Sequence, residues 1–216
     1  MAENNSNAKN EIKIILLGNA GVGKTSIILR YYKNKFETNS VSTIGSTFVI
    51  KELQRDNITY KLNIWDTSGQ EKYRSVTKLF VQGAKIIILV YSIDNKESFD
   101  ILDFWNKSIL EISEGEENIV LAIVGNKSDK FEDAVITEEE GKKYAEGKNA
   151  IFKLVSAKDD PKGISSLFDT LLDELIKKNP NLKSGPDNIK LDKVEKKKKK
   201  EHGGRCCWKI KIMFKI

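Results

Sequence analysis

The chain has 216 residues, of which 39% are hydrophobic and 31% charged, enough apolar content for one packed domain with polar tails. Its net charge of +6 is unevenly spread. From Lys183 onward there are twelve Lys and Arg against four Asp and Glu, so this segment carries +8 and the rest about −2. A surface that reads nucleic acid needs its basic residues on the folded domain, so we expect no nucleic acid partner.

Targeting signals are few. No apolar run approaches the roughly 18 residues that span a bilayer, and residues 1–10 are polar, unlike a signal or transit peptide. We expect this N-terminal stretch to be disordered. Ala2 excludes N-myristoylation. The body lacks cysteine, which fits a reducing compartment, so the chain is predicted to be cytoplasmic.

Short branched-aliphatic runs alternate with helical patterns along the chain. Continuous apolar runs predict buried parallel strands at 12–18, 86–91, 118–125 and 150–156. Two more strand-like segments, 46–55 and 58–65, flank an Asp56-Asn57 turn of hairpin type. Helical spacing predicts helices at 24–33, 98–112, 137–146 and 163–178.

This order predicts an α/β fold of the P-loop NTPase type. We expect a doubly wound, mostly parallel six-stranded sheet with one antiparallel edge strand and helices on both faces. Pro180 stops the last helix. The domain should therefore cover residues 11–179, followed by a flexible basic tail over 180–216 that carries a cysteine pair.

The first site motif is GNAGVGKTS, residues 18–26, which fits G-x-x-x-x-G-K-[ST] between a buried strand and a helix. Its glycines let successive N–H groups face phosphate oxygens, and the helix N-terminus adds positive potential. Lys24 is predicted to bridge the β- and γ-phosphates, and the Thr25 hydroxyl to bind Mg²⁺. A glycine-rich turn that only caps a helix is the disfavoured alternative. The other motif residues assigned to the nucleotide are Gly18, Ala20, Gly21, Val22, Gly23 and Ser26.

The second motif, WDTSGQE at 65–71, follows a predicted strand. Asp66 can orient a water bound to Mg²⁺. The N–H of Gly69 can donate to a γ-phosphate, and Gln70 can position an attacking water. The motif therefore predicts the catalytic end of the site, at the sheet edge where open α/β folds bind ligands.

Two further motifs at strand ends predict recognition of the base. In NKSD, residues 126–129, Asp129 can accept hydrogen bonds from guanine N1–H and the exocyclic amine, which adenine does not offer together. In SAK, residues 156–158, the N–H of Ala157 can donate to guanine O6. A single carboxylate would more often cap a helix or face solvent, but four motifs in order on strand ends favour a nucleotide site. The remaining residues assigned here are Asn126, Lys127, Ser156 and Lys158.

Together these motifs resemble those of the Ras-superfamily small GTPases over about residues 11–178. The resemblance implies that the chain binds GTP and GDP with Mg²⁺ and hydrolyses GTP. It also implies that Thr43 reaches Mg²⁺ and the γ-phosphate only in the GTP state, and that Phe36 packs edge-on against guanine. The segments TIGSTF (43–48), KLNIWDTSGQEKYRSVT (61–77) and LVYSID (89–94) are most similar to the Rab family.

The implied function is a Rab-type switch that regulates vesicle traffic through GTP-dependent effector binding. A Ras-like signalling GTPase and a catalytically silent GTP-binding scaffold are the open alternatives; NKSD and SAK disfavour an ATPase or small-molecule kinase. The expected catalytic residues are Gln70 and Lys24. Arg30 lies in the helix after the phosphate loop and Arg74 beyond Gln70, so neither is assigned as an internal arginine finger. We therefore expect slow intrinsic hydrolysis.

The resemblance implies a monomer with several partners: an exchange factor, a GTPase-activating protein, effectors and a GDP-dissociation inhibitor. Effectors would read two loops, about 36–47 and 67–80, that respond to the γ-phosphate. Candidate effector contacts, for which ordinary core packing is an equal alternative, are Ile44, Phe48, Trp65 and Tyr73.

The C-terminal sequence suggests a membrane anchor. Lys196 to Lys200 are five consecutive positive charges, each worth about 1 kcal/mol near anionic lipid. By resemblance, Cys206 and Cys207 are candidate sites of geranylgeranylation, which predicts peripheral attachment to the cytosolic face of an intracellular membrane. Nine residues, WKIKIMFKI, follow the pair. They lie in the membrane interface, are trimmed, or come from a reading frame that runs past the true end.

Overall fold

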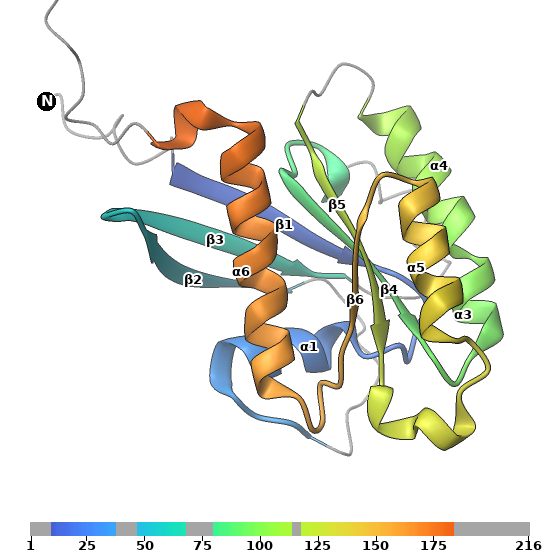
Figure 1. The fold of residues 1–216 in the computed structure, drawn as a ribbon. Coiled ribbons are helices and arrows are strands. Elements are labelled where there is room, and N and C mark those ends of the chain that lie inside the picture. Colours follow the sequence, from blue (N-terminus) through green and yellow to red (C-terminus); the bar gives the residue numbers. More distant parts are fainter. Residues whose placement is uncertain (1–9, 38–46, 68–79, 114–117, 184–216) are drawn as a thin grey trace, which may run out of the picture.

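The structure is a computed structural model that describes residues 10–37, 47–67, 80–113 and 118–183 (Figure 1). The strands are β1 (Glu11–Leu17), β2 (Thr47–Arg55), β3 (Ile58–Asp66), β4 (Ile86–Ser92), β5 (Val120–Asn126) and β6 (Ile151–Leu154). The helices are α1 (Lys24–Lys33), α3 (Lys96–Asp100), α4 (Leu102–Ile112), α5 (Glu138–Gly147) and α6 (Pro161–Lys178), with short 3₁₀ segments η3 (Ser128–Asp133) and η4 (Pro180–Lys183).

The strands form one sheet in the order β2-β3-β1-β4-β5-β6. β2 is antiparallel to β3, and every other neighbouring pair is parallel, which confirms the predicted sheet with its antiparallel edge strand. All seven residues of β4 are buried, as a strand covered on both faces requires. Asp56 and Asn57 form the predicted hairpin turn with φ of 50° and 62°, values that suit the twist of the two strands.

Helices cover both faces of the sheet, as predicted (Figure 1). On one face α1 and α6 contribute Ile27 and Leu171 to a core with Ile14 of β1. On the other face Trp105 of α4 and Ala145 of α5 pack against the second core. The apolar strands are thus buried from both sides, and their polar ends are left to form a site.

Two helices differ from their predicted limits. α6 begins at Pro161 rather than residue 163, because the Asp160 side chain caps it by accepting a hydrogen bond from the Gly163 N–H over 2.8 Å. The predicted helix at 98–112 is divided at Ile101, whose ψ of −9° departs from the helical value.

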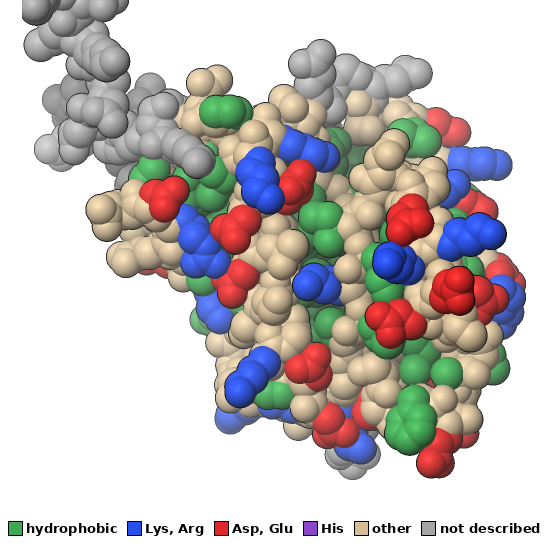
Figure 2. Space-filling view, viewed as in Figure 1, with side chains coloured by type: hydrophobic (Ala, Val, Ile, Leu, Met, Phe, Trp, Pro, Cys, Tyr) green, Lys and Arg blue, Asp and Glu red, His purple; other side chains and the backbone are tan. Residues whose placement is uncertain are grey.

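The chain stays packed against the core just past α6. In η4, Leu182 packs against the core, and the Tyr60 hydroxyl donates to the Leu182 carbonyl oxygen over 3.0 Å. Residues 1–9 and 184–216 lie outside the described residues, so disorder there stays a prediction. Figure 2 shows basic and acidic side chains interspersed over α5 and α6 on the face it draws. None of the described helices is long and apolar enough to cross a bilayer.

Candidate nucleotide-binding site

The described residues of the predicted site follow the carboxyl ends of the parallel strands. β1 leads into Gly18, β3 ends at Asp66, β5 ends at Asn126, and Ser156 follows β6. Carboxyl ends of parallel strands share one edge of the sheet. Since β1 lies between β3 and β4, the phosphate loop has Asp66 on one side and the two base motifs on the other.

Two glycines of the phosphate loop sit where no side chain fits. A Cβ at Gly18 would lie 2.1 Å from the Val90 carbonyl oxygen of β4, and one at Gly23 would lie 2.3 Å from Nδ2 of Asn126. α1 begins directly after Gly23, and among the described residues no side chain caps its first turn. The positive end of the α1 helix dipole therefore faces the phosphate loop, where it favours an anion.

Lys24 is buried over this loop, with 5% of its surface exposed. Its Nζ donates to the carbonyl oxygens of Gly18 and Asn19 over 2.8 and 2.9 Å. Burial lowers the pKa of Lys24 to about 8, although the charge of Asp66 acts in the opposite direction. A desolvated ammonium of this kind gains strongly when a phosphate approaches it.

Thr25 and Asp66 are joined across the site. The Thr25 hydroxyl donates to Oδ2 of Asp66 over 2.7 Å. Oδ1 of Asp66 is buried and has no hydrogen-bond partner among the described residues. Burial raises the pKa of Asp66, against the hydrogen bond from Thr25 and the charge of Lys24. A hydroxyl beside a carboxylate with one unpartnered oxygen fits the oxygen ligands that Mg²⁺ prefers.

Such an ion would need further ligands. Within the described ranges, no three His, Cys, Asp or Glu side chains come together as a metal site. The donors that Thr25 and Asp66 supply match a Mg²⁺ that keeps water and takes phosphate oxygens, which is its usual binding mode beside nucleotides. The residues present therefore fit the ion.

Asn126 connects the phosphate loop to the base motifs. It is 1% exposed, and its Nδ2 donates to the Val22 carbonyl oxygen over 2.8 Å. Its Oδ1 accepts from the Ala157 N–H over 3.1 Å. This N–H was predicted to donate to guanine O6. In the structure it already donates to a protein oxygen. A base bound here would have to share it.

Ser156 holds the carboxylate of Asp129. Its Oγ donates to Oδ1 of Asp129 over 2.5 Å and accepts from the N–H groups of Lys158 and Asp159 over 3.2 and 3.0 Å. The carboxylate of Asp129 is thereby fixed beside the loop that carries Ala157. Two acceptor sites on one oriented carboxylate suit the paired N–H donors of guanine.

Comparison with known proteins identifies the family. A model described as the Ras family matches residues 13–177. The chain belongs to the Ras family. Human Ras-related protein Rab-22A is 36% identical over 93% of this chain and 100% of its own length. Mouse Rab-17 is 42% identical over 77% of this chain and 76% of its own, and the fission yeast GTP-binding protein ypt3 is 36% identical over 82% of each.

These relatives make the chain a Rab-type small GTPase, which binds guanine nucleotide, hydrolyses GTP and acts as a switch in vesicle trafficking. Several predicted residues of this GTPase lie outside the described residues, and their roles stay predictions: Thr43, Gly69, Gln70, Cys206 and Cys207. Phe36 is described; it is partly buried and packs against the core beside α1 and α6. Its contact with guanine stays a prediction too.

An aromatic cluster lies beside the site of this Rab-type GTPase. Phe48, 53% exposed on β2, stacks on Trp65 of β3 with ring centroids 5.1 Å apart. Phe80 lies 6.2 Å from Trp65, and Nζ of Lys13 lies 5.4 Å from the same ring. Phe80 was not among the predicted effector contacts. Ile44 and Tyr73, which were, fall outside the described residues.

Asp94 pairs with Lys127 of the base motif, a contact that the motifs did not indicate. It follows β4 by two residues, just as the predicted site residues follow their strands. Its carboxylate accepts a hydrogen bond from the Ser92 hydroxyl. Oδ2 accepts a second one from Nζ of Lys130 over 2.7 Å, and Oδ1 lies 3.7 Å from Nζ of Lys127 in the base motif. Burial alone would raise the pKa of Asp94, but the hydrogen bonds from Lys130 and Ser92 hold it below its usual value.

Proposed function

We propose that this pocket binds GTP and GDP together with Mg²⁺ and is the site of hydrolysis. The observation that carries the proposal is the pair of hydrogen bonds through which Asn126 joins the phosphate loop to the base loop. One connected site would then bind both the phosphates and the base. Thr25 and Asp66 would hold Mg²⁺, the latter through water, and Thr43 would join them in the GTP state.

The proposed reaction is in-line attack of water on the γ-phosphate. Gln70 orients the water, and Lys24 with the first-turn N–H groups of α1 stabilises charge on the phosphoryl oxygens. Bound Mg²⁺ supplies charge neutralisation at those oxygens. The two described arginines are engaged elsewhere, Arg30 with loop carbonyls and Arg55 with carboxylates of α6. We therefore expect slow intrinsic hydrolysis of GTP, which a GTPase-activating protein would stimulate by supplying an arginine.

The proposed switch consists of the loops at about 36–47 and 67–80. Contacts of Thr43 and Gly69 with the γ-phosphate hold both loops, and cleavage releases them. Phe48, Trp65 and Phe80 lie next to these loops, and a partly exposed aromatic cluster is the kind of surface that partners bind. Effectors would read this surface in the GTP state, while an exchange factor and a GDP-dissociation inhibitor act on the GDP state.

Membrane attachment is proposed through the tail. Lys196 to Lys200 would attract anionic lipid, and lipid chains on Cys206 and Cys207 would anchor the protein at the cytosolic face of an intracellular membrane. Mass spectrometry of protein from its native cell tests this. Added prenyl mass on the cysteines supports the proposal, whereas bare cysteines with Ile216 intact contradict it.

Hydrolysis is tested by single-turnover release of phosphate from GTP by the purified chain. Gln70→Leu should slow the reaction at least about tenfold, which corresponds to about 1.4 kcal/mol of lost transition-state stabilisation. Gln54→Leu, at an exposed position of β2, is the matched control and should leave the rate unchanged. Equal rates for wild type and Gln70→Leu would contradict the assigned catalytic role.

A further inference from the structure

Arg30, on the last turn of α1, is bound to the loop that follows β6. Its Nε donates to the Ala157 carbonyl oxygen over 2.8 Å, and its Nη2 donates to the Lys158 carbonyl oxygen over 2.7 Å. Both are short bonds from a charged donor, the stronger class of hydrogen bond. The helix that begins at the phosphate loop therefore ends on the loop predicted to recognise the base.

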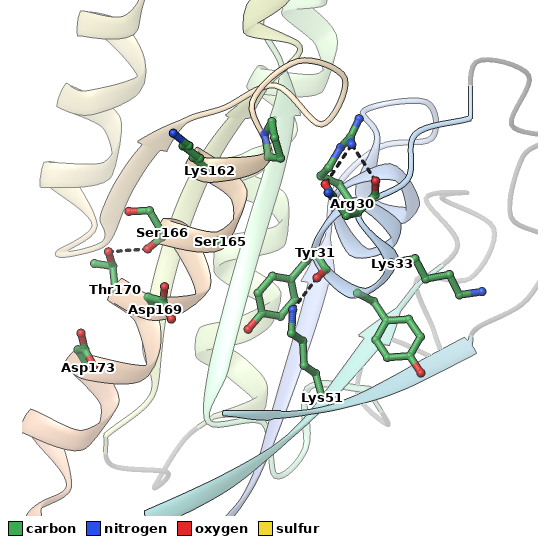
Figure 3. A pocket seen from close by; sticks show the side chains of 13 residues that line it. Arg30, Tyr31, Lys33, Lys51, Lys162, Ser165, Ser166, Asp169, Thr170 and Asp173 are labelled. Atoms are coloured by element: carbon green, nitrogen blue, oxygen red, sulfur yellow. Dashed lines mark hydrogen bonds between the residues drawn. The ribbon is translucent and has the colours of Figure 1, made fainter. Parts of the chain in front are cut away.

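The third nitrogen of the same guanidinium binds a different segment. Nη1 donates to the carbonyl oxygen and Oδ1 of Asn34 over 3.1 and 3.3 Å, marked by the dashed lines at Arg30 in Figure 3. Asn34 ends α1 in a left-handed conformation with φ of 52°, two residues before Phe36. Arg30 thus ties the chain that leads to Phe36 to the SAK loop, the two segments predicted to enclose guanine.

Other polar side chains of this region serve a different purpose. Arg30 lies at the rim of an open groove of about 970 Å³ between α1, β2 and α6 (Figure 3). There Nζ of Lys51 donates to the Tyr31 carbonyl oxygen over 2.7 Å, and Arg55 pairs with Asp169 and Asp173 of α6. These contacts hold the helices and β2 together, whereas the contacts of Arg30 reach the site itself.

We propose that Arg30 is a positioning residue for guanine recognition. By fixing the Ala157 and Lys158 carbonyl groups, it holds the backbone next to Ser156, whose hydroxyl orients Asp129. The carboxylate of Asp129 can then bind the base without rearrangement, and bound nucleotide dissociates slowly. A lysine keeps the charge but cannot reproduce the planar fork that spans three carbonyl groups. This inference rests on the proposed function of the pocket.

The test uses the full chain loaded with a fluorescent ribose-labelled GDP and chased with excess GDP and Mg²⁺. Arg30→Gln should speed dissociation about tenfold, and Arg30→Lys should have a smaller effect in the same direction. The affinity ratio of GDP to IDP should also fall, because IDP lacks only the amino group that Asp129 is placed to read. A loss of this ratio reports base recognition, which general loosening of the fold would not change selectively.

Two controls separate positioning from stability. Lys33→Gln changes an exposed cation on the same turn of α1 and should leave rate and ratio unchanged. Arg55→Gln should lower the melting temperature while leaving the GDP to IDP ratio at the wild-type value.

Three outcomes would overturn the inference. The first is a folded Arg30→Gln or Arg30→Lys protein with wild-type dissociation rate and ratio. The second is an Arg30 variant that behaves like Arg55→Gln, with lower stability and an unchanged ratio. The third, wild-type protein that binds no GDP, would overturn the proposed function itself and is recognised before any variant is made.

Discussion

The side-chain amide of Asn126 donates a hydrogen bond to the Val22 carbonyl oxygen, 104 residues away, over 2.8 Å. The oxygen of the same amide accepts from the Ala157 N–H. One buried side chain at the end of β5 therefore connects the phosphate loop to the loop that follows β6. We therefore expect a disturbance at the base loop to reach the phosphate loop as well.

Asn126→Ala leaves the Val22 carbonyl and the Ala157 N–H without their partner. We expect the free energy of unfolding to fall by about 2–4 kcal/mol, since each unsatisfied buried group costs about 1–2 kcal/mol. GDP dissociation should quicken in the same protein. Urea unfolding and a nucleotide chase measure the two effects. Asn63→Ala, on a partly exposed position of β3, is the control; equal losses in both variants would contradict the coupling.

Removal of Mg²⁺ tests the Thr25–Asp66 pair. Chelation by EDTA should speed GDP release at least about tenfold from wild-type protein, a change of about 1.4 kcal/mol. Asp66→Asn should release GDP quickly with or without EDTA, because its amide is a poorer partner for a cation-bound water. If Asp66→Asn responded to EDTA as wild type does, Asp66 would not belong to the ion's site.

Replacement by alanine should cost very different amounts of stability at two glycines of the phosphate loop. Gly18→Ala places a Cβ 2.1 Å from a backbone oxygen of β4 and should cost at least about 3 kcal/mol of stability. At Gly21 no atom of a non-adjacent described residue lies within 4 Å of such a Cβ, and φ is +77°, so Gly21→Ala should cost only about 1 kcal/mol of backbone strain. Denaturant unfolding compares them, and equal costs would contradict the loop geometry.

Asp94 predicts an acid dependence of stability. Its pKa is lowered in the folded state, so its contribution is present above the unfolded value of about 3.9 and is lost as the pH falls through the lowered folded value. Asp94→Asn should therefore lower stability at pH 7, by about 1 kcal/mol or less, and less at pH 3. Urea midpoints at both pH values measure this. A deficit that grew toward pH 3 would contradict the sign.

Local sequence was sufficient to predict much of the fold. The run from Ile86 to Tyr91 is apolar throughout and forms the fully buried β4, because such a run tolerates no solvent-facing side. α1 begins and ends as predicted, at Lys24 and Lys33, between two residues with positive φ, Gly23 and Asn34. The start of α6 was missed by two residues although its signal, Asp160 followed by proline, is local.

The candidate site, like the fold, was predictable from the sequence only where it depends on local patterns. Motif residues such as Lys24 and Asp129 follow the carboxyl ends of β1 and β5, at the predicted edge of the sheet, and their roles stay predictions. The contacts of Asn126 and Arg30 join segments more than 100 residues apart and depend on tertiary packing, such as that of α1 beside α6, which no local pattern encodes. Asp94 had a signal, its place just beyond a strand end, that was not used.

Base selection by Asp129 is the central claim, and calorimetric titration of nucleotide-depleted protein with Mg²⁺ tests it most directly. Wild type should bind GDP tightly and XDP and ADP weakly or not at all. Asp129→Asn should weaken GDP and strengthen XDP, because an amide donates to the C2 carbonyl that xanthine has in place of the guanine amine. Tight binding of ADP by wild type, or an unchanged GDP affinity in Asp129→Asn, would contradict the account.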